Sequence, residues 1–375
     1  MVASPIAVLR VSHAVCPSKY KVFLRYNERF RRPSGMAARK SNPSAPLGPK
    51  AEPLSESADT KSSLATDASP SSPEVLRTLY SVLVKTRLLQ EQVLTLSRAG
   101  KIPRVAVPTL GGEATEVGAC IGLQADDSFA ASQPKLAAHV VKNTPLHRVF
   151  AELFARHKQP PPQPTSNGAG ALRLIPPASS LTGQLDIAAG VAYAYRSLGK
   201  PNVVVALADD GLAALGFWHE AAWLASGHRL PIVFIVEDCA QSQANGTSVV
   251  QSHEDLRDRA EAYGIPGITV DGNDIVAVWR VTQESIHRAR TGAGPTLIEC
   301  RTWRWHGEAA NPSANGRSEP KLLHARWQND PLHHMEHYMK KRKLWQRAWK
   351  DRLVNEYQAA LATAVSSLEP IAKSR

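Results

Sequence analysis

The stretch of sequence that decides the fold reads V-V-V-A-L-A-D-D-G at residues 203–211 and, after an alanine-rich run, P-I-V-F-I-V-E-D-C at residues 231–239. Within it, residues 203–207 and 232–236 have the apolar, β-branched composition of buried parallel strands. The run between them, residues 212–226, has the composition of a helix and is followed by glycine, which favours helix C-termini. The stretch therefore predicts a strand–helix–strand unit, whose ligand-binding edge lies at the carboxyl ends of the strands.

Both predicted strands end in polar residues. Asp209 and Asp210 follow the first strand, and Glu237, Asp238 and Cys239 follow the second. Because the carboxyl ends of adjacent parallel strands meet at one edge of a sheet, we expect these two groups to lie side by side. Aspartate and glycine are also common in ordinary turns, so the acidic pair alone does not define a functional site.

The composition is that of a sizeable globular domain with tails. Of 375 residues, 43% are hydrophobic and 21% are charged, which is enough apolar sequence for a large core. The net charge of +12 raises nucleic-acid binding as an alternative, but the excess gathers in residues 1–35 and 340–352, and no nucleic-acid-binding motif accompanies it. The cysteines are widely spaced, which favours a reducing compartment. No apolar run reaches the roughly 20 residues of a membrane span, so we expect neither nucleic acid nor a membrane as a partner.

Residues 1–72 have the composition of a disordered tail. Residues 1–35 are basic with a single acidic residue, Glu28, which is typical of a mitochondrial transit peptide and would imply the mitochondrial matrix. Alternatively, Met36 is the true start and the protein is cytoplasmic, and both interpretations stay open. Residues 40–72 are rich in Ser, Pro and Ala, the composition of a disordered linker.

Order is expected to begin at Ser72. Ser72, Pro73 and Glu74 are an N-cap, a first-position proline and a first-turn acid, and apolar residues follow at helical spacing. We therefore predict one α/β domain over residues 73–370, a doubly wound parallel sheet with flanking helices that ends in a helical part at residues 320–370.

Several short motifs occur along this domain in a definite order. They are G-K-I at 100–102, L-G-G-E-A at 110–114, D-D-G at 209–211, V-D-G-N-D at 270–274 and W-Q-N-D-P at 327–331. In this order they resemble the alpha subunits of the thiamine-diphosphate-dependent first, decarboxylating component of 2-oxo acid dehydrogenase complexes, of the pyruvate or branched-chain type. Gly112 replaces a glutamine that is usual there. The resemblance covers about residues 74–370 and implies the thiamine-diphosphate-binding α/β fold.

The resemblance also implies an activity and partners. It implies an oxidoreductase that acts on the aldehyde or oxo group of its donor, with the lipoyl disulfide as acceptor. Such a subunit works with a beta-type subunit to decarboxylate a 2-oxo acid and to pass the acyl group to a lipoyl acyltransferase core. The implied cofactors are thiamine diphosphate and Mg²⁺. A second interpretation stays open, in which the chain is a paralogue without catalysis that keeps the fold and the subunit interface as a structural or regulatory partner.

The family holds its metal with a G-D-G motif and a later pair of asparagines, and this chain departs from both. Asp210 stands at the family's metal-binding Asp, while Asp209 replaces the preceding glycine. Asp238 and Cys239 stand at the two asparagines, and a cysteine thiol suits Mg²⁺ poorly because the ligand is soft. The candidate metal ligands are Asp210, Asp238, Cys239 and Gln241.

The remaining candidates follow from two further motifs. The family's Tyr-Arg pair, whose Arg holds the diphosphate, falls on Gln133 and Pro134, so the adjacent Lys135 is the available cation. The family's catalytic His, counted from Arg304, falls on Glu308, and the nearest histidine is His306. The implied cofactor-binding residues are Asp209, Asp210, Gly211, Gln133, Lys135, Gln184 and Arg304, and the catalytic candidates are His306 and Glu308.

Overall fold

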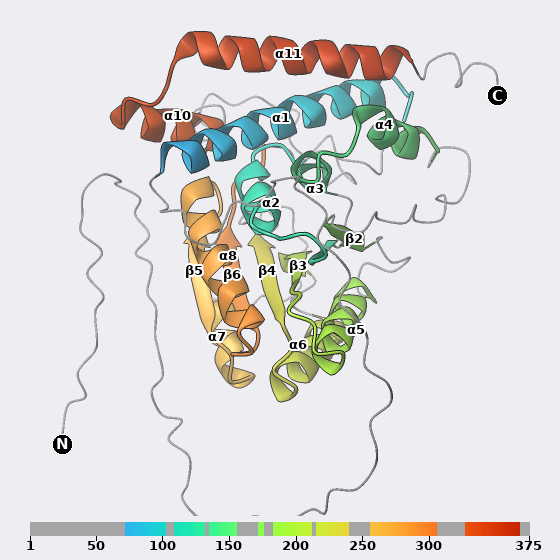
Figure 1. Cartoon of the computed structure of the whole chain (residues 1–375), viewed down its shortest axis with the longest axis vertical. Helices are drawn as coiled ribbons and strands as arrows, with labels where there is room; N and C mark the ends of the chain where they lie inside the picture. The colour runs from blue at the N-terminus through green and yellow to red at the C-terminus, as the bar shows by residue number, and fades with distance from the viewer. Residues whose placement is uncertain are drawn as a thin grey trace, which may run out of the picture.

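The computed structural model describes residues 72–102, 109–131, 135–155, 172–175, 183–211, 215–239, 256–305 and 327–367. Within these ranges the chain folds into one parallel sheet with helices on both faces (Figure 1). The predicted fold class, an α/β protein with a doubly wound parallel sheet, is confirmed. In this described part of the chain, no helix is both long enough and apolar enough to cross a membrane.

The sheet has the strand order β2-β1-β3-β4-β6-β5, and every neighbouring pair is parallel. The strands are β1 (Ser128–Ala131), β2 (Arg173–Ile175), β3 (Val204–Asp209), β4 (Ile232–Asp238), β5 (Gly267–Asp271) and β6 (Thr296–Arg301). The chain moves outward from β1 to β2 and then returns to the other side of β1. The topological switch point, at which such sheets bind their ligands, therefore lies between β1 and β3.

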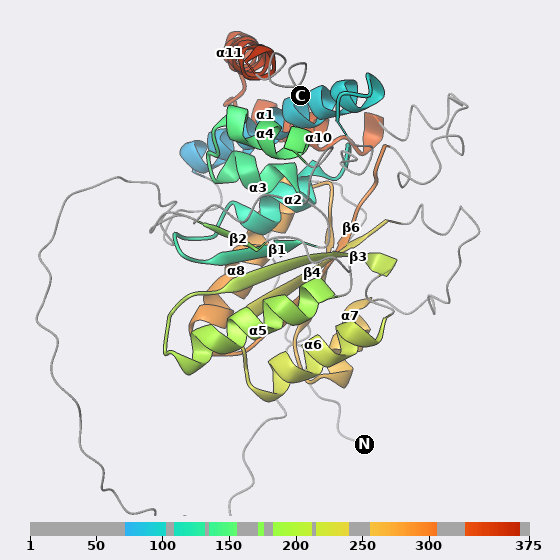
Figure 2. The ribbon, with the colours of Figure 1, turned by 90° about the vertical axis from the view of Figure 1, so that its right-hand side faces the viewer.

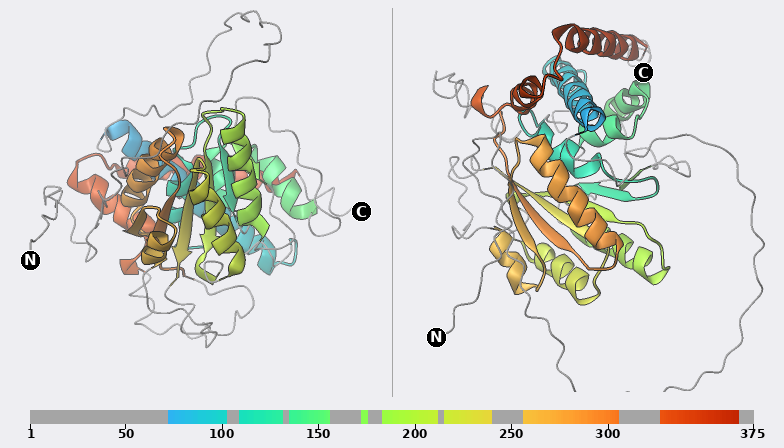
Figure 3. Two further views of the ribbon diagram at one scale, coloured as in Figure 1. Left: turned by 90° about the horizontal axis from the view of Figure 1, so that it is seen from below. Right: turned by 60° about the vertical axis from the view of Figure 1, so that its left-hand side comes forward.

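The helices form one layer on each face of the sheet and a further layer outside. α5, α6 and α7 cover one face, and α2, α3 and α8 cover the other (Figure 2). Beyond α2 and α3, α1 packs with α4, α10 and α11 (Figures 1 and 3). The helices are α1 (Pro73–Arg98), α2 (Glu113–Cys120), α3 (Leu136–Val141), α4 (Leu146–Ala155), α5 (Gly183–Ser197), α6 (Gly216–Gly227), α7 (Leu256–Ala262), α8 (Ile275–Arg290), α10 (Pro331–Lys341) and α11 (Arg347–Ser366).

The predicted strand–helix–strand unit is present, with shifted boundaries. Both strands run further than predicted, because the ladder continues through the pairs Asp209–Glu237 and Asp238–Arg301. The glycine expected just after the helix is instead its last residue, and the left-handed backbone that reverses the chain belongs to Arg229, with φ 48°.

The predicted helix start at Ser72, and a second start at Asp274, have the capping geometry that their sequences indicate. The Ser72 hydroxyl accepts a hydrogen bond from the Val75 N–H at 3.3 Å, with proline in the first turn of α1. The Asp274 carboxylate at the start of α8 accepts from the N–H groups of Val276 and Ala277 at 3.0 and 3.1 Å. Each cap satisfies N–H groups that have no partner within their own helix.

Candidate cofactor site at the carboxyl edge of the sheet

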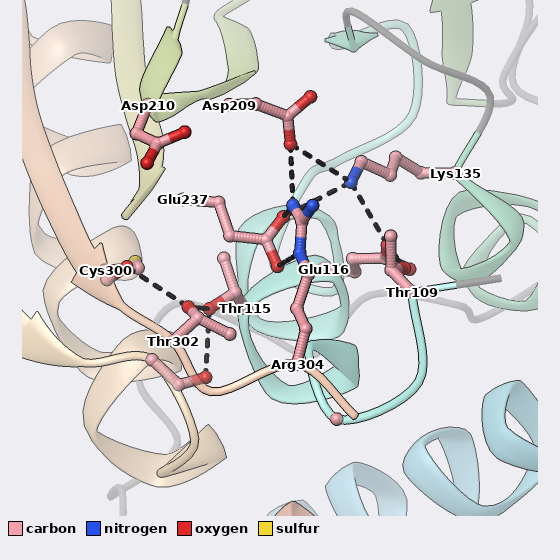
Figure 4. A network of polar contacts seen from close by, with 12 residues as sticks. Thr109, Thr115, Glu116, Lys135, Asp209, Asp210, Glu237, Cys300, Thr302 and Arg304 are labelled. Carbon is pink, nitrogen blue, oxygen red and sulfur yellow. Dashed lines mark hydrogen bonds and ion pairs between the residues drawn. The ribbon is translucent and has the colours of Figure 1, made fainter. Parts of the chain in front are cut away.

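A group of charged side chains, here called the charged cluster, gathers at the carboxyl edge of the sheet (Figure 4). It consists of Glu116 in α2, Lys135 before α3, Asp209 at the end of β3, Glu237 in β4 and Arg304 after β6. Lys135 follows β1 and Asp209 ends β3, so the cluster flanks the switch point of the sheet.

Arg304 binds two carboxylates at once. Its Nη2 lies 2.6 Å from Asp209 Oδ1 and 2.5 Å from Glu237 Oε2, and its Nε donates to Glu237 Oε1 at 3.1 Å. The contact with Glu237 is therefore a two-point, charge-assisted pairing of a guanidinium with a carboxylate. Burial by itself lowers the pKa of Arg304, but the neighbouring acidic groups hold that pKa well above its ordinary value.

Lys135 is the second cation, and it is almost completely buried. Its Nζ lies 3.2 Å from Glu237, 3.3 Å from Glu116 and 4.0 Å from Asp209. Burial by itself lowers the pKa of Lys135, but the three surrounding carboxylates outweigh it and raise that pKa, so the ammonium group stays charged. Lys135, the cation proposed from the sequence to replace the family's diphosphate-binding Arg, therefore lies within the charged cluster.

The pKa values of the two buried carboxylates shift in opposite directions, although burial alone would raise both. Burial raises the pKa of Glu116 above its ordinary value, and the Lys135 ammonium offsets this only in part. Burial also acts to raise the pKa of Glu237, but the charges of Arg304 and Lys135 prevail and hold it below its ordinary value. Glu237 is therefore the firmly ionised partner of both cations.

A glycine makes room for the Glu237 carboxylate. A Cβ atom at Gly112 would lie 2.4 Å from Glu237 Oε1, which is closer than a carbon atom can approach. The glutamine usual at this position in the resembling family would therefore meet Glu237. At the neighbouring Gly111, φ is +95° and a Cβ would lie 2.6 Å from the Trp303 carbonyl oxygen, so both glycines are required by contact or conformation.

A second buried ion-pair group holds the loop before α2 in place. Arg87 of α1 forms a salt bridge with Glu113, and its Nη2 lies 2.9 Å from Asp330 at the start of α10. The Arg87 guanidinium also stacks on the Trp305 ring at 4.2 Å from its centroid. Since Trp305 is the residue after Arg304, this group fixes the position of the site's arginine from the outer helix layer.

The structure brings some of the predicted site residues into contact and places others nearby. Asp209, Lys135 and Arg304 are in direct contact, and Figure 4 shows the Asp209 carboxylate directed at both cations. Asp210, at the same strand end, is buried and its Oδ1 accepts from the Gly211 N–H at 2.8 Å. Asp238 and Cys239 lie at the end of β4, and Gln184 at the start of α5 has its Nε2 3.5 Å from the Ile175 carbonyl oxygen. Gln133, Gln241, His306 and Glu308 lie outside the described residues.

Sequence reasoning missed two members of the charged cluster. Glu237 follows a predicted strand and Glu116 lies two residues after the L-G-G-E-A motif, but neither is among the candidate site residues. A signal was available for Glu237, because a glutamate at the end of an apolar strand requires a cation as partner. No local signal identifies Glu116, whose partners Gln90, Thr109 and Lys135 come from other segments.

As arranged here, the described residues do not fit a magnesium-bound diphosphate. The Asp209 carboxylate already pairs with both cations, Lys135 and Arg304, which an anionic phosphate would need as partners. Burial raises the pKa of the Cys239 thiol, so this residue is a neutral sulfur and a poor Mg²⁺ ligand. Among the residues that the structure describes, no three His, Cys, Asp or Glu side chains form a group that could hold a metal ion.

Comparisons with known proteins agree with this fold. Residues 80–372 match the family model described as "Dehydrogenase E1 component". The chain is 28% identical over 271 residues to the alpha subunit of acetoin:2,6-dichlorophenolindophenol oxidoreductase from Bacillus subtilis (strain 168), covering 70% of this chain and 80% of that protein. It is 29% identical over 300 residues to the pyruvate dehydrogenase E1 component subunit alpha of Staphylococcus aureus (strain Mu50), covering 79% and 78%. For the protein of that name from Bacillus cereus the identity is 27% over 306 residues, covering 81% and 80%.

The chain is an α/β protein with a parallel, doubly wound sheet and a charged site at its switch point, and its family match places this fold in the thiamine-diphosphate-binding class. The chain belongs to the dehydrogenase E1 component family, and within it the chain is similar to the alpha subunits, as its motifs predicted. The family depends on thiamine diphosphate, and its alpha subunits partner with beta subunits.

Proposed function

We propose that this chain is the alpha subunit of a 2-oxo acid dehydrogenase first component. In this proposal it takes part in the oxidative decarboxylation of a 2-oxo acid and the transfer of the acyl group to lipoyl. The observation that carries the proposal is the family match over residues 80–372. The alignments with the relatives support it, because they span most of the length of those proteins. The charged cluster lies at the switch point of a doubly wound sheet, where such sheets bind their ligands, although the Asp209 carboxylate already pairs with both of its cations.

The cations would divide the work of holding an anionic cofactor tail. The Arg304 guanidinium is a rigid fork that matches phosphate oxygens, while the Lys135 ammonium acts as a point charge. Gly211 and Gln184 are proposed to line the same edge of the sheet, with Gln133 in the segment between β1 and Lys135.

Metal and catalytic roles are proposed on the sequence candidates. Asp210 and Asp238 offer the carboxylate oxygens that Mg²⁺ prefers, with Cys239 and Gln241 as further candidates. His306 and Glu308 are proposed as catalytic residues, because Glu308 stands at the position of the family's catalytic His, four residues after Arg304, and His306 is the nearest histidine.

A beta-type subunit is the proposed partner, and the lipoyl acyltransferase core would join through the same complex. Apolar side chains on and beside α6 support a subunit interface, because Leu215, Phe217 and Trp223 are 40%, 44% and 68% exposed. For the compartment we propose the cytoplasm, with the mitochondrial matrix as the alternative if residues 1–35 are a transit peptide.

The test is turnover by the reconstituted complex. The full chain is combined with a beta-type subunit, thiamine diphosphate and Mg²⁺, and decarboxylation of pyruvate, branched-chain 2-oxo acids and acetoin is followed with an artificial electron acceptor. We expect turnover of at least one substrate only when both subunits are present, and its loss in Arg304→Met. An assembled complex that turns over none of them at saturating cofactor would contradict the proposal and favour the non-catalytic paralogue.

A further inference from the structure

We propose that Asp209 is an intramolecular anion that occupies the anion site formed by Lys135 and Arg304, so that a diphosphate group binds there only when this carboxylate leaves. The inference rests on the proposed function, because it concerns how that same site takes its ligand. It differs from simple repulsion by a nearby charge, since the carboxylate and the ligand would compete for the same two cations.

The first step is the position of the carboxylates around the cations. The Glu237 side chain is 0% exposed and the Glu116 side chain 1%, whereas the Asp209 side chain is 17% exposed. Asp209 is thus the carboxylate on the solvent side, and the two glutamates lie beneath the cations. A ligand that arrives from solvent meets Asp209 first.

The second step is the strength of its contacts. Asp209 Oδ1 lies 2.6 Å from Arg304 Nη2 and 4.0 Å from Lys135 Nζ, so it bridges both cations. An ionised hydrogen bond of this length is among the strong ones in proteins. A diphosphate would need the same donor atoms, and it must therefore displace an interaction that is already made.

The third step is the charge balance of the cluster. Three carboxylates face two cations, and Asp209 is the one whose removal leaves the buried pairs intact. With Asp209 the cluster has three carboxylates for two cations, and without it the two cations face only the two buried glutamates. The position beside Arg304 and Lys135 on the solvent side is then open to an external anion.

The fourth step is that Asp209 can leave without unfolding its strand. Its backbone is fixed by the β3–β4 ladder opposite Glu237, so only the side chain needs to rotate. Breaking the ion pair between Asp209 and Arg304 therefore requires only a side-chain rotation at the end of a rigid strand.

The experiment measures binding of inorganic pyrophosphate to the full chain by calorimetry without divalent metal, so that neither the metal nor the rest of the cofactor contributes. Asp209→Asn and Asp209→Ser both remove the charge. Two different substitutions are used so that a folding defect in one of them does not decide the result. Asp351→Asn, at an exposed ion pair on α11, is the control with the same change in net charge. We expect both Asp209 variants to bind about tenfold tighter or more than wild type, the control to match wild type, and Arg304→Met in the Asp209→Asn background to abolish the gain.

Equal affinity of wild type and both Asp209 variants, including no measurable binding in any of them, would overturn the proposal. An equal gain in Asp351→Asn would also overturn it, because the effect would then be one of net charge. Turnover of the reconstituted complex separates this inference from the proposed function. A tenfold gain in an inactive complex supports the internal anion and rejects the function, whereas an active complex without the gain rejects the internal anion alone.

Discussion

Glu237 is the residue on which the charged cluster depends, because both cations contact it. Its carboxylate is fully buried and meets Arg304 through two bonds and Lys135 at 3.2 Å. A buried charge in this setting is tolerated only while its partners are present, and removing one partner leaves the others uncompensated. Asp209 differs, since it lies at the solvent side of the same cations.

We therefore expect Glu237→Gln to destabilise the protein strongly, because it leaves two buried cations without their shared partner. The expected loss in the free energy of unfolding is about 3–5 kcal/mol. Asp209→Asn, the matched removal of a charge at the solvent side, should cost about 1–2 kcal/mol. Urea unfolding followed by circular dichroism measures the free energy of unfolding of both variants. Equal losses would show that the depth of burial does not decide which carboxylate contributes more to stability.

At the scale of elements, the start of α2 and the end of β4 are fitted to each other through Gly112. Because a Cβ there would lie 2.4 Å from Glu237 Oε1, Gly112→Ala must move an ion-paired side chain. We expect a loss of about 1–3 kcal/mol in the free energy of unfolding. Gly190→Ala in α5, where a Cβ would meet nothing within 4 Å, should instead be neutral or stabilising by up to about 1 kcal/mol. If Gly112→Ala were as stable as wild type, Glu237 could shift freely, which would contradict the claim that the charged cluster holds this side chain rigidly.

The same elements show how far the sequence could predict the structure. The apolar runs of β3 and β4 indicate buried strands from their local composition alone, so the parallel unit and its polar edge could be predicted. The strand ends could not, because Asp209 lies beside Arg304 from a distant segment and Asp238 continues the ladder opposite Arg301, and neither neighbour can be read from the local sequence. For the same reason Lys135 could be placed near the site by family resemblance, while its pairing with Glu116 could not.

At the scale of the whole molecule, the described fold begins with its own cap. The Ser72 hydroxyl caps α1, so no residue before it is needed to start that helix. We expect deletion of residues 1–71 to leave the melting temperature unchanged within error, because the sequence of that segment lacks apolar periodicity. Differential scanning calorimetry makes the comparison, and a clear drop would show that the segment packs on the domain.

We also expect the folded chain to associate, because α5 and α6, which lie side by side against one face of the sheet (Figure 2), carry exposed apolar side chains that would otherwise contact water. The predicted state is a hetero-tetramer with a beta-type subunit, or a homodimer without it. Trp223→Glu should weaken association, whereas Lys341→Glu on α10, a comparable change at a polar position, should not. Light scattering at micromolar concentration measures the mass, and the mass of a single chain for wild type would rule out this assembly.

The most direct measurement is thiamine diphosphate binding, with Mg²⁺, to the complex of this chain with a beta-type subunit. Calorimetry compares wild type with Asp209→Gly/Cys239→Asn/Pro134→Arg, which removes the internal anion and restores a metal ligand and an arginine. Since each charge-assisted contact contributes about 1.5–3 kcal/mol, we predict that the triple variant binds roughly a hundredfold tighter or more. Low-micromolar binding by wild type, with no gain in the triple variant, would contradict the conclusion that Asp209 occupies the diphosphate's place.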